Sequence, residues 1–352
     1  MSPFTYTINP ARVVFGPGNL QQVAAEVRNL GGTRALVLST PFQKQDAEHL
    51  NATLGKLGAG VFSDAAMHTP VEVTERAMQA YQQAGADCVV ALGGGSTIGL
   101  GKAIAYRNNA LQVVVPTTYA GSEVTPILGQ TENGVKTTVK DASVLPEVVI
   151  YDAELTLGLP VAMSVTSGLN AMAHAVEGLY AKDRNPIISI LAYEGIRALK
   201  EALPTIRQAP QDVEARSQAL YGSWLCGTVL GTVGMALHHK LCHTLGGSFD
   251  LPHAETHAIM LPHTAAYNQG AARDALAPIT ELFGGDLGEG LHAFAESLGA
   301  PLSLKSLGLE ESDLSAAADL AVKNPYWNPR SIERDAVLAL LQRAWSGDSP
   351  SA

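Results

Sequence analysis

The sequence predicts an α/β N-terminal domain built on a parallel sheet, followed by an all-α C-terminal domain. Short β-rich runs alternate with helical stretches through the first 150 residues, and such runs disappear after about residue 160. The length of 352 residues also exceeds what a single core usually fills, since such cores stop growing near roughly 250 to 300 residues. Two domains are therefore expected.

The elements of the first domain are expected in alternating order. The predicted strands are 34–40, 58–64, 87–92, 111–118 and 146–152, and the predicted helices between them are 46–57, 71–86 and 98–106. Such alternation favours a parallel sheet with helices on both faces. The second domain is expected to contain helices at 164–180, 187–206, 213–245, 271–282 and 288–298. We place the boundary near Val161, which gives a nucleotide-binding domain at 1–160, a helical domain at 161–352 and an active site in the cleft between them.

Composition excludes several classes of partner. The net charge is −10 and the pI is about 5.4, with no basic stripe to neutralise nucleic acid. The N-terminus has no long apolar run behind basic residues, so neither a signal peptide nor a membrane anchor is expected. Three cysteines, Cys88, Cys226 and Cys242, stand in apolar surroundings, which is typical of buried thiols. These features predict a cytoplasmic protein.

A glycine-rich turn follows the predicted strand at 87–92. Gly93, Gly94 and Gly95 allow a tight strand-to-helix turn, and Ser96 is placed to cap the next helix. Backbone amides at such a turn bind pyrophosphate, although a bare triple glycine is equally compatible with a simple turn. The next strand ends in a second polar segment, which contains Thr117, Thr118, Ser122 and Thr125. Since ligands collect at the carboxyl ends of parallel strands, the two segments together predict a cofactor cleft.

The strand at 34–40 ends in Ser39 and Thr40, where an acidic residue often grips the adenosine ribose. Without that carboxylate we expect weak discrimination between NADH and NADPH. The alternative is that another part of the chain holds the ribose.

A cluster of histidines occupies the helical half. Of ten histidines, His174 and six between His238 and His263 lie there. Asn170 and His174 are four residues apart on one helix face, and His239 and His243 repeat that spacing. A further pair, His253 and His257, lies one turn apart, whereas His238 points away from His239 and is expected to be structural. A lone histidine is usually a core residue, but several together can bind metal, transfer protons or bind carboxylates.

These motifs occur in the order found in iron-type alcohol dehydrogenases. GGGS at Gly93, PTTYAGSEVT at Pro116, DAELTLGLP at Asp152 and HHKLCHTLGGSFDLPHAETHAIMLPH at His238 carry the resemblance, which covers nearly the whole chain. It implies the Rossmann-like sheet and helical domain shared with dehydroquinate synthase. It also implies that Lys136 lies near the cofactor, that His243 lies near the nicotinamide, and that the family's metal ligands match His174, His239 and His253.

The departures from the family pattern indicate a particular branch. The family's aspartate ligand is replaced by Asn170, a neutral amide that binds divalent cations less well than a carboxylate does. Gly99 stands where many relatives carry aspartate, and Ala254 and His257 replace a glycine and an asparagine. These changes resemble the branch that reduces maleylacetate to 3-oxoadipate in aromatic-compound degradation. The resemblance implies NADH or NADPH as cofactor, no required metal, and a homodimer.

The site residues follow from that resemblance. We expect His243, or another of His174, His239 and His253, to supply a proton or polarise the substrate ketone. The substrate dicarboxylate would be bound by this set: Asn170, His174, His239, His243, His253 and His257. Other basic residues, namely Arg12, Lys140, Lys323 and Arg330, are more often solvated surface groups.

Three alternatives stay open at this point. A metal-dependent alcohol or polyol dehydrogenase would hold Fe²⁺ or Zn²⁺ on the three histidines. A lyase similar to dehydroquinate synthase would need a firmly held metal and more phosphate-binding lysines. A non-catalytic binding protein would leave the histidine cluster without a role.

Overall fold

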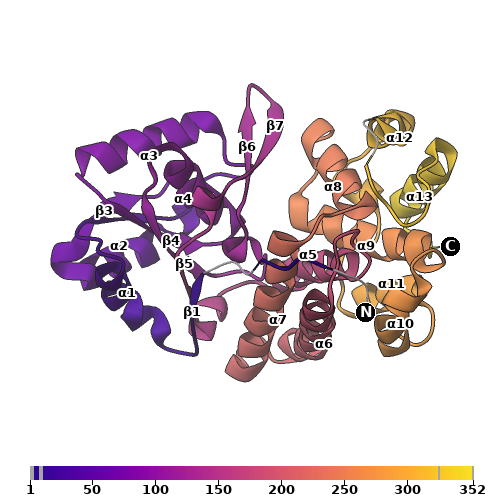
Figure 1. Ribbon diagram of the computed structural model, residues 1–352, viewed down its shortest axis with the longest axis horizontal. Helices are drawn as coiled ribbons and strands as arrows, with labels where there is room; N and C mark the ends of the chain where they lie inside the picture. The colour runs from indigo at the N-terminus through magenta and orange to yellow at the C-terminus, as the bar shows by residue number, and fades with distance from the viewer. Residues whose placement is uncertain (1–3, 8–10, 324–325, 351–352) are drawn as a thin grey trace. The chain divides into compact units, whose positions relative to one another are not determined.

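The computed structural model describes residues 4–7, 11–323 and 326–350 (Figure 1). The chain divides into two compact units: unit 1 comprises Met1–Thr7, Pro160–Pro210 and Tyr221–Ala352, and unit 2 comprises Ile8–Leu159 and Gln211–Leu220. Unit 2 therefore includes a short stretch of the helical half of the sequence, and unit 1 includes the N-terminal residues.

Unit 2 is built on a six-stranded parallel sheet with the order β1-β8-β5-β4-β2-β3. Its strands are β1 (Arg12–Phe15), β2 (Ala35–Leu38), β3 (Gly58–Phe62), β4 (Cys88–Gly93), β5 (Leu111–Pro116) and β8 (Val148–Tyr151). Its helices are α1 (Val23–Asn29), α2 (Lys44–Leu54), α3 (Val71–Gln83) and α4 (Gly95–Asn108). The predicted parallel α/β domain is confirmed, although β1 lies outside the strands that the pattern predicts.

Alternation along the strands separates two apolar layers. Val37 and Val90 pack with the helices α1 and α2 on one face, whereas Leu36 and Val89 pack with α3 and α4 on the other. Both faces of the sheet are thus covered, which is why its strands read as continuous apolar runs.

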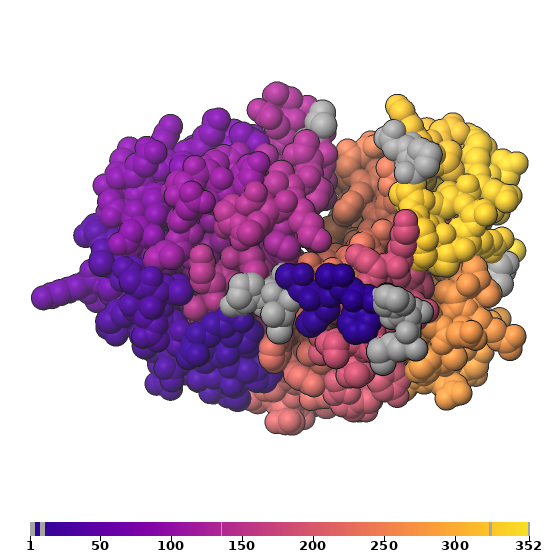
Figure 2. All heavy atoms as spheres, viewed as in Figure 1, coloured from indigo at the N-terminus to yellow at the C-terminus, as the bar shows by residue number. Residues whose placement is uncertain are grey.

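An antiparallel hairpin extends from the sheet unit (Figures 1 and 2). It consists of β6 (Ile127–Glu132) and β7 (Val135–Lys140), joined at Asn133 and Gly134, which both have positive φ. The sequence pattern did not predict this hairpin, because its strands are largely polar.

The described part of unit 1 is helical. Its helices are α5 (Val161–Leu179), α6 (Pro186–Gln208), α8 (Leu237–Ser248), α9 (His253–Gln269), α10 (Arg273–Leu282), α11 (Leu287–Ser297), α12 (Leu314–Val322) and α13 (Arg334–Ser346), and α7 (Val213–Thr232) begins in unit 2 and ends here. The buried helix α5 packs against α6 and α9, and α8 packs against α9. This packing brings the histidines of α5, α8 and α9 together.

The prediction of one helix over 213–245 is wrong. The chain breaks between α7 and α8, and the two helices meet at 95°. At the break, the backbone amides of Ala236 and His238 donate to the carboxylate of Glu177, at 2.9 and 2.8 Å. This carboxylate caps the start of α8, so a tertiary contact ends the periodic pattern.

Among the described residues no single helix meets the length and hydropathy required to cross a membrane. The bent pair of α7 and α8 meets them only when the two helices are taken together.

Candidate active site

The glycine turn lies at the carboxyl edge of the sheet. The strand β4 ends at Gly93, Gly94 is the N-cap of α4, and the helix begins at Gly95. No side chain caps this helix end, and Ser96 lies within the first turn, so the expectation that Ser96 is the cap is wrong. An uncapped helix N-terminus leaves amide donors and a positive dipole end for an anion.

Close packing explains the glycines of this turn. A Cβ on Gly94 would lie 2.7 Å from Cγ2 of Thr118, and Gly93 has a φ of +154°. By contrast, Gly95 is exposed and has open space where a Cβ would stand. The space beside Gly94 is therefore filled by Thr118, and the open space lies beside Gly95 at the N-terminus of α4. Pyrophosphate binding at this turn stays a prediction.

Polar side chains join this turn to the loop after β5. The backbone amide of Thr117 donates to the Gly93 carbonyl at 3.1 Å, and Nε2 of Gln43 donates to Oγ1 of Thr117 at 3.1 Å. Gln43 was missed by the sequence analysis, because a lone glutamine between two elements gives no pattern. It ties the segment after β2 to the strand ends that we predict to hold the cofactor.

Lys102 holds the second predicted cofactor loop from within α4. Its ammonium donates to the backbone carbonyls of Ser122, Thr125 and Ile127 at 2.6, 2.7 and 2.9 Å, and to Oγ1 of Thr125 at 2.9 Å. Lys102 is 1% exposed, and burial lowers its pKa to about 7 while nearby Glu123 opposes that shift. The loop that carries Ser122 and Thr125 is thus fastened to the helix that follows the glycine turn.

The remaining predicted cofactor residues lie in different surroundings. Ser39 is fully buried, and its backbone amide donates to the Phe62 carbonyl at 3.1 Å, whereas Thr40 is half-buried just before a 3₁₀ turn. Lys136 lies half-buried on β7 of the hairpin. The roles of these three residues in cofactor binding stay predictions.

Gly99 is required by its neighbour. A Cβ at this position would lie 2.4 Å from Oγ1 of Thr69, a residue with a φ of +46°. A side chain at 99 therefore meets a β-branched residue in an unfavourable backbone conformation. A larger side chain at 99 would therefore require Thr69 to move.

Three helices of unit 1 bring the histidines together. Nδ1 of His174, on α5, lies 2.8 Å from Nε2 of His239, on α8. The ring of His257, on α9, lies 6.0 Å from that of His174 and 5.1 Å from that of His239, centroid to centroid. The centroid of His253 lies 4.4 Å from that of His257. The predicted cluster is thus a single group of imidazoles.

Exposure differs across the cluster. His174, His239 and His257 are buried, His253 is half-buried, and His243 is exposed, with its centroid 6.1 Å from that of His239. His243 is therefore the most exposed member of the cluster, and His174, His239 and His257 are its buried members.

A buried carboxylate, Glu177, supports the cluster from α5. Its Oε2 lies 2.7 Å from Nδ1 of His239. Burial alone raises the pKa of Glu177, but the hydrogen bond and charge of His239, together with the amide of Ala236, lower it to about 2. Glu177 therefore stays ionised and accepts a hydrogen bond from Nδ1 of His239. Glu177 was not predicted as a site residue, although it follows His174 by three residues, a spacing that places both on one helix face.

The family's metal positions do not present a complete ligand set. Asn170 is 3% exposed, and its Oδ1 has no hydrogen-bond partner within the described ranges. Two of the three histidines are hydrogen-bonded to each other through His174 Nδ1 and His239 Nε2. Ligand atoms that share a metal ion should lie within about 4.8 Å of one another. Among the described residues, His238, Cys242 and His257 meet this distance, whereas His174, His239 and His253 are not found together in such a group. The residues present therefore do not fit the family's metal.

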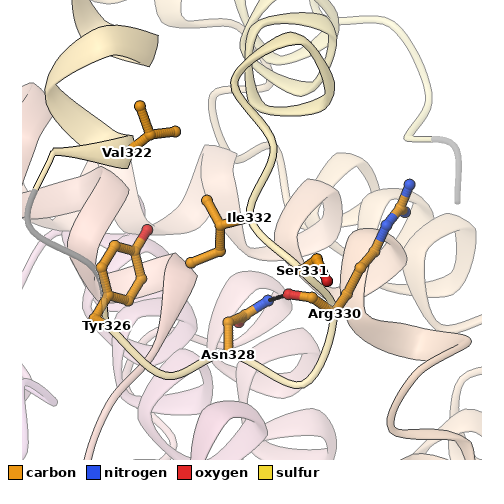
Figure 3. A pocket seen from close by; sticks show the side chains of 6 residues that line it. All are labelled: Val322, Tyr326, Asn328, Arg330, Ser331 and Ile332. Atoms are coloured by element: carbon orange, nitrogen blue, oxygen red, sulfur yellow. Dashed lines mark hydrogen bonds between the residues drawn. The ribbon is translucent and has the colours of Figure 1, made fainter.

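A pocket of about 270 Å³ lies in unit 1 and is lined by Val322, Tyr326, Asn328, Arg330, Ser331 and Ile332 (Figure 3). Arg330 does not point into it: the guanidinium stacks 4.1 Å from the ring centroid of Tyr267, and the side chain extends away from the other labelled residues. Asn328 bonds to Asn268, which donates to the hydroxyl of Tyr180 at 3.2 Å. The pocket is thus linked by polar side chains to α5, and Arg330 is occupied structurally.

Comparisons with known proteins agree with this architecture. Residues 10–153 match the family model described as iron-containing alcohol dehydrogenase, and residues 164–345 match the C-terminal model of the Fe-containing alcohol dehydrogenase family. A sulfoacetaldehyde reductase from Bifidobacterium kashiwanohense, solved in complex with NAD⁺, has the same fold with a TM-score of 0.91, 22% identity, and coverage of 99% of this chain and 100% of that chain. The chain belongs to the iron-containing alcohol dehydrogenase family and is an oxidoreductase.

Its full-length relatives in that family are more specific. A maleylacetate reductase from Rhizobium sp. (strain MTP-10005) is 69% identical over 350 residues, covering 99% of this chain and 100% of the relative. The crystal structure of maleylacetate reductase from Agrobacterium tumefaciens superposes with a TM-score of 0.97 and 68% identity, covering 99% of this chain and 100% of that one.

Proposed function

We propose that this protein reduces the carbon–carbon double bond of maleylacetate, giving 3-oxoadipate, with NADH or NADPH as the hydride source. The observation that carries the proposal is the group of buried imidazoles that lacks an anionic ligand at Asn170, in a chain 69% identical to a maleylacetate reductase. A cluster of this kind suits a dicarboxylate, because neutral or cationic imidazoles attract the anion that a carboxylate ligand would repel.

The chemistry sets the tasks of the side chains. A bound reduced nicotinamide supplies a hydride to the alkene carbon β to the ketone. Negative charge then develops on the ketone oxygen, which requires a hydrogen-bond donor there and a proton for the neighbouring carbon. In this proposal His243, exposed at the rim of the cluster, supplies the proton, and ionised Glu177 orients His239 by accepting from its Nδ1.

The proposal requires no metal. Its support is the donor set: a neutral amide at Asn170 and a direct 2.8 Å hydrogen bond between His174 and His239. Ser39 and Thr40 leave no carboxylate at the end of β2, so the use of both NADH and NADPH is part of the proposal. The homodimer, the cytoplasmic location and the absence of nucleic-acid or membrane partners stay predictions.

One observation favours a second candidate, a metal-dependent alcohol or polyol dehydrogenase. Histidines that ligate metals commonly donate a hydrogen bond from their other ring nitrogen to a carboxylate, as His239 does to Glu177.

One experiment separates the two candidates. NADH oxidation is followed with maleylacetate as substrate, using chelator-treated protein assayed for iron and zinc, with NADPH in parallel. Turnover by metal-free protein supports the reductase. Activity on simple alcohols that appears only with added Fe²⁺ or Zn²⁺ would support the second candidate instead.

A further inference from the structure

The pocket of unit 1 contains a buried hydroxyl without a partner. Oη of Tyr326 is buried and has no hydrogen-bond partner in the described part of the chain. It points toward the space between Val322 and Ile332 (Figure 3). Burial, followed by the charge of Glu177, raises the pKa of Tyr326, so the phenol keeps its hydrogen and can donate it. An unsatisfied buried donor costs free energy, which a ligand with an acceptor recovers.

The loop that carries Tyr326 is fixed by polar contacts with α9. The hydroxyl of Tyr267 donates to the Ser331 carbonyl at 2.6 Å, and Nδ2 of Asn328 donates to Oδ1 of Asn268 at 2.7 Å. The loop therefore uses the amide of Asn328 to hold its own position, and the hydroxyl of Tyr326 is left for a ligand.

An ammonium group lies against the same aromatic ring. Nζ of Lys240, on α8, is 5.8 Å from the ring centroid of Tyr326. Among the described residues Lys240 forms no ion pair with a carboxylate. Its charge opposes that of Glu177, which acts on Tyr326. An anion beside Tyr326 therefore meets a cation as well as a hydroxyl donor, and such charge-assisted contacts are the strong ones.

The same ammonium belongs to the helix face that carries an accessible imidazole. Lys240 precedes His243 by three residues, so the two side chains leave α8 on one side. A ligand that reaches His243 is thus also within the neighbourhood of Lys240.

We propose that Tyr326 and Lys240 bind the carboxylate of the substrate's acetate arm, in the pocket that Val322 and Ile332 also line. The inference rests on the proposed function and divides the two carboxylates of maleylacetate between two places. A methylene group separates the acetate carboxylate from the ketone, so this arm takes no part in hydride transfer and can enter a separate pocket. Val322 and Ile332 suit that methylene. The other carboxylate is attached to the alkene carbon that receives the hydride, and it must stay with the reacting atoms near the imidazoles.

The first test compares two ligands that differ at this carboxylate. 3-Oxoadipate carries it, whereas 4-oxopentanoate is the methyl ketone that lacks it. The full-length protein with NAD⁺ would be titrated with each ligand by calorimetry. We expect Tyr326→Phe to weaken 3-oxoadipate binding about tenfold or more, as loss of a hydrogen bond to a charged group does, and to leave 4-oxopentanoate binding unchanged. Equal losses for the two ligands, or no loss for 3-oxoadipate, overturn the proposal.

A lysine elsewhere in unit 1 provides a matched control. Lys240→Gln should weaken 3-oxoadipate binding selectively, as Tyr326→Phe does. Lys305 is exposed, and its ammonium lies 4.9 Å from the ring centroid of Trp345. Lys305→Gln removes the same kind of contact between a cation and a ring, and both ligands should bind as they do to the wild type. Equal effects of the two lysine variants would mean that overall charge, and not a contact at Tyr326, sets the affinity.

The second test separates binding from a structural role. We expect Tyr326→Phe to lower kcat/KM for maleylacetate about tenfold. For cis-4-oxopent-2-enoate, which has a methyl group in place of the acetate arm, kcat/KM should not change. The thermal midpoint of Tyr326→Phe should equal or exceed that of the wild type, because the variant removes an unsatisfied buried donor. A lower midpoint with equal losses on both substrates would make Tyr326 a structural residue.

Failure of this inference can be told apart from failure of the proposed function. Selective binding of 3-oxoadipate through Tyr326 in a protein that does not reduce maleylacetate would leave the carboxylate site standing and remove the function. Reduction of maleylacetate at an unchanged rate in Tyr326→Phe would leave the function standing and remove the site.

Discussion

Oε2 of Glu177 lies 2.7 Å from Nδ1 of His239, and the same carboxylate accepts the amides of Ala236 and His238 at the first turn of α8. One side chain thus ends α7, begins α8 and orients a histidine of the cluster. This contact joins the fold to the chemistry of the site more directly than any motif in the sequence.

Removal of the Glu177 charge should impair turnover. In Glu177→Gln, one side-chain oxygen becomes an NH₂ group that faces donors such as the amides of Ala236 and His238, and His239 loses its anionic partner. We expect kcat/KM for maleylacetate to fall about 10–100-fold, the usual range for partners behind an active-site histidine. Glu194→Gln is the control, because Glu194 pairs with Arg197 on α6. Equal kinetics in the two variants would remove Glu177 from the mechanism.

A carboxylate at position 170 should recruit metal. Asn170→Asp places an anionic oxygen beside His174, where a divalent cation gains a hard ligand. We expect more bound Fe²⁺ or Zn²⁺ by elemental analysis and a lower kcat/KM for maleylacetate, because the new charge repels the dianion. Asn185→Asp serves as the control, since Asp can replace Asn in capping α6. Unchanged metal content and kinetics in Asn170→Asp would contradict both expectations.

Loss of the Lys102 ammonium should loosen the loop after β5. Lys102→Ala leaves a buried gap lined by the carbonyls of Ser122, Thr125 and Ile127. We expect the KM for NADH to rise about tenfold or more, since hydrogen bonds from a charged group are worth roughly 1.5–3 kcal/mol, with a smaller change in kcat. Methylammonium should partly restore the KM by filling the gap.

The matched control is Lys44→Ala, which removes an exposed ammonium on α2. A KM that does not respond to methylammonium, in a Lys102→Ala protein with a normal thermal midpoint, would show that the loop does not depend on this ammonium.

A buried histidine outside the cluster should make folding sensitive to acid. His263 is 2% exposed, and neither ring nitrogen has a hydrogen-bond partner among the described residues. Burial, followed by the charge of His292, lowers its pKa from 6.5 to about 3. Between these values the unfolded chain binds a proton that the native state does not bind, so stability is lost as the pH falls from 6.5 towards 3.

His263→Leu should therefore flatten the dependence of the free energy of unfolding on pH in that window. It should also stabilise the protein by about 1 kcal/mol near pH 7, because an unsatisfied buried polar group is removed. Denaturant titrations from pH 4 to 8 would measure both effects, with the exposed His49→Leu as control. A slope equal to that of the wild type would mean that His263 is already protonated in the native state.

Local pattern predicted a large part of this molecule. The strands β2, β4, β5 and β8 were predicted because buried parallel strands form continuous apolar runs, and the half-buried edge strand β3 was predicted as well. Asn170, His174, His239 and His243 were predicted to share helix faces, which α5 and α8 confirm. The hairpin of β6 and β7 was missed, because polar strands of six residues give no burial signal.

The sequence by itself determined five of the six sheet strands, the glycine turn and the set of imidazoles, because these depend on residue type and short-range spacing. Only the tertiary structure decided where α7 ends, that Glu177 holds His239, and that Lys102 fastens the cofactor loop. Each of these depends on a buried polar group whose partner lies twenty or more residues away in the sequence. Such pairing follows from the cost of leaving a buried charge unsatisfied, and no local periodicity encodes it.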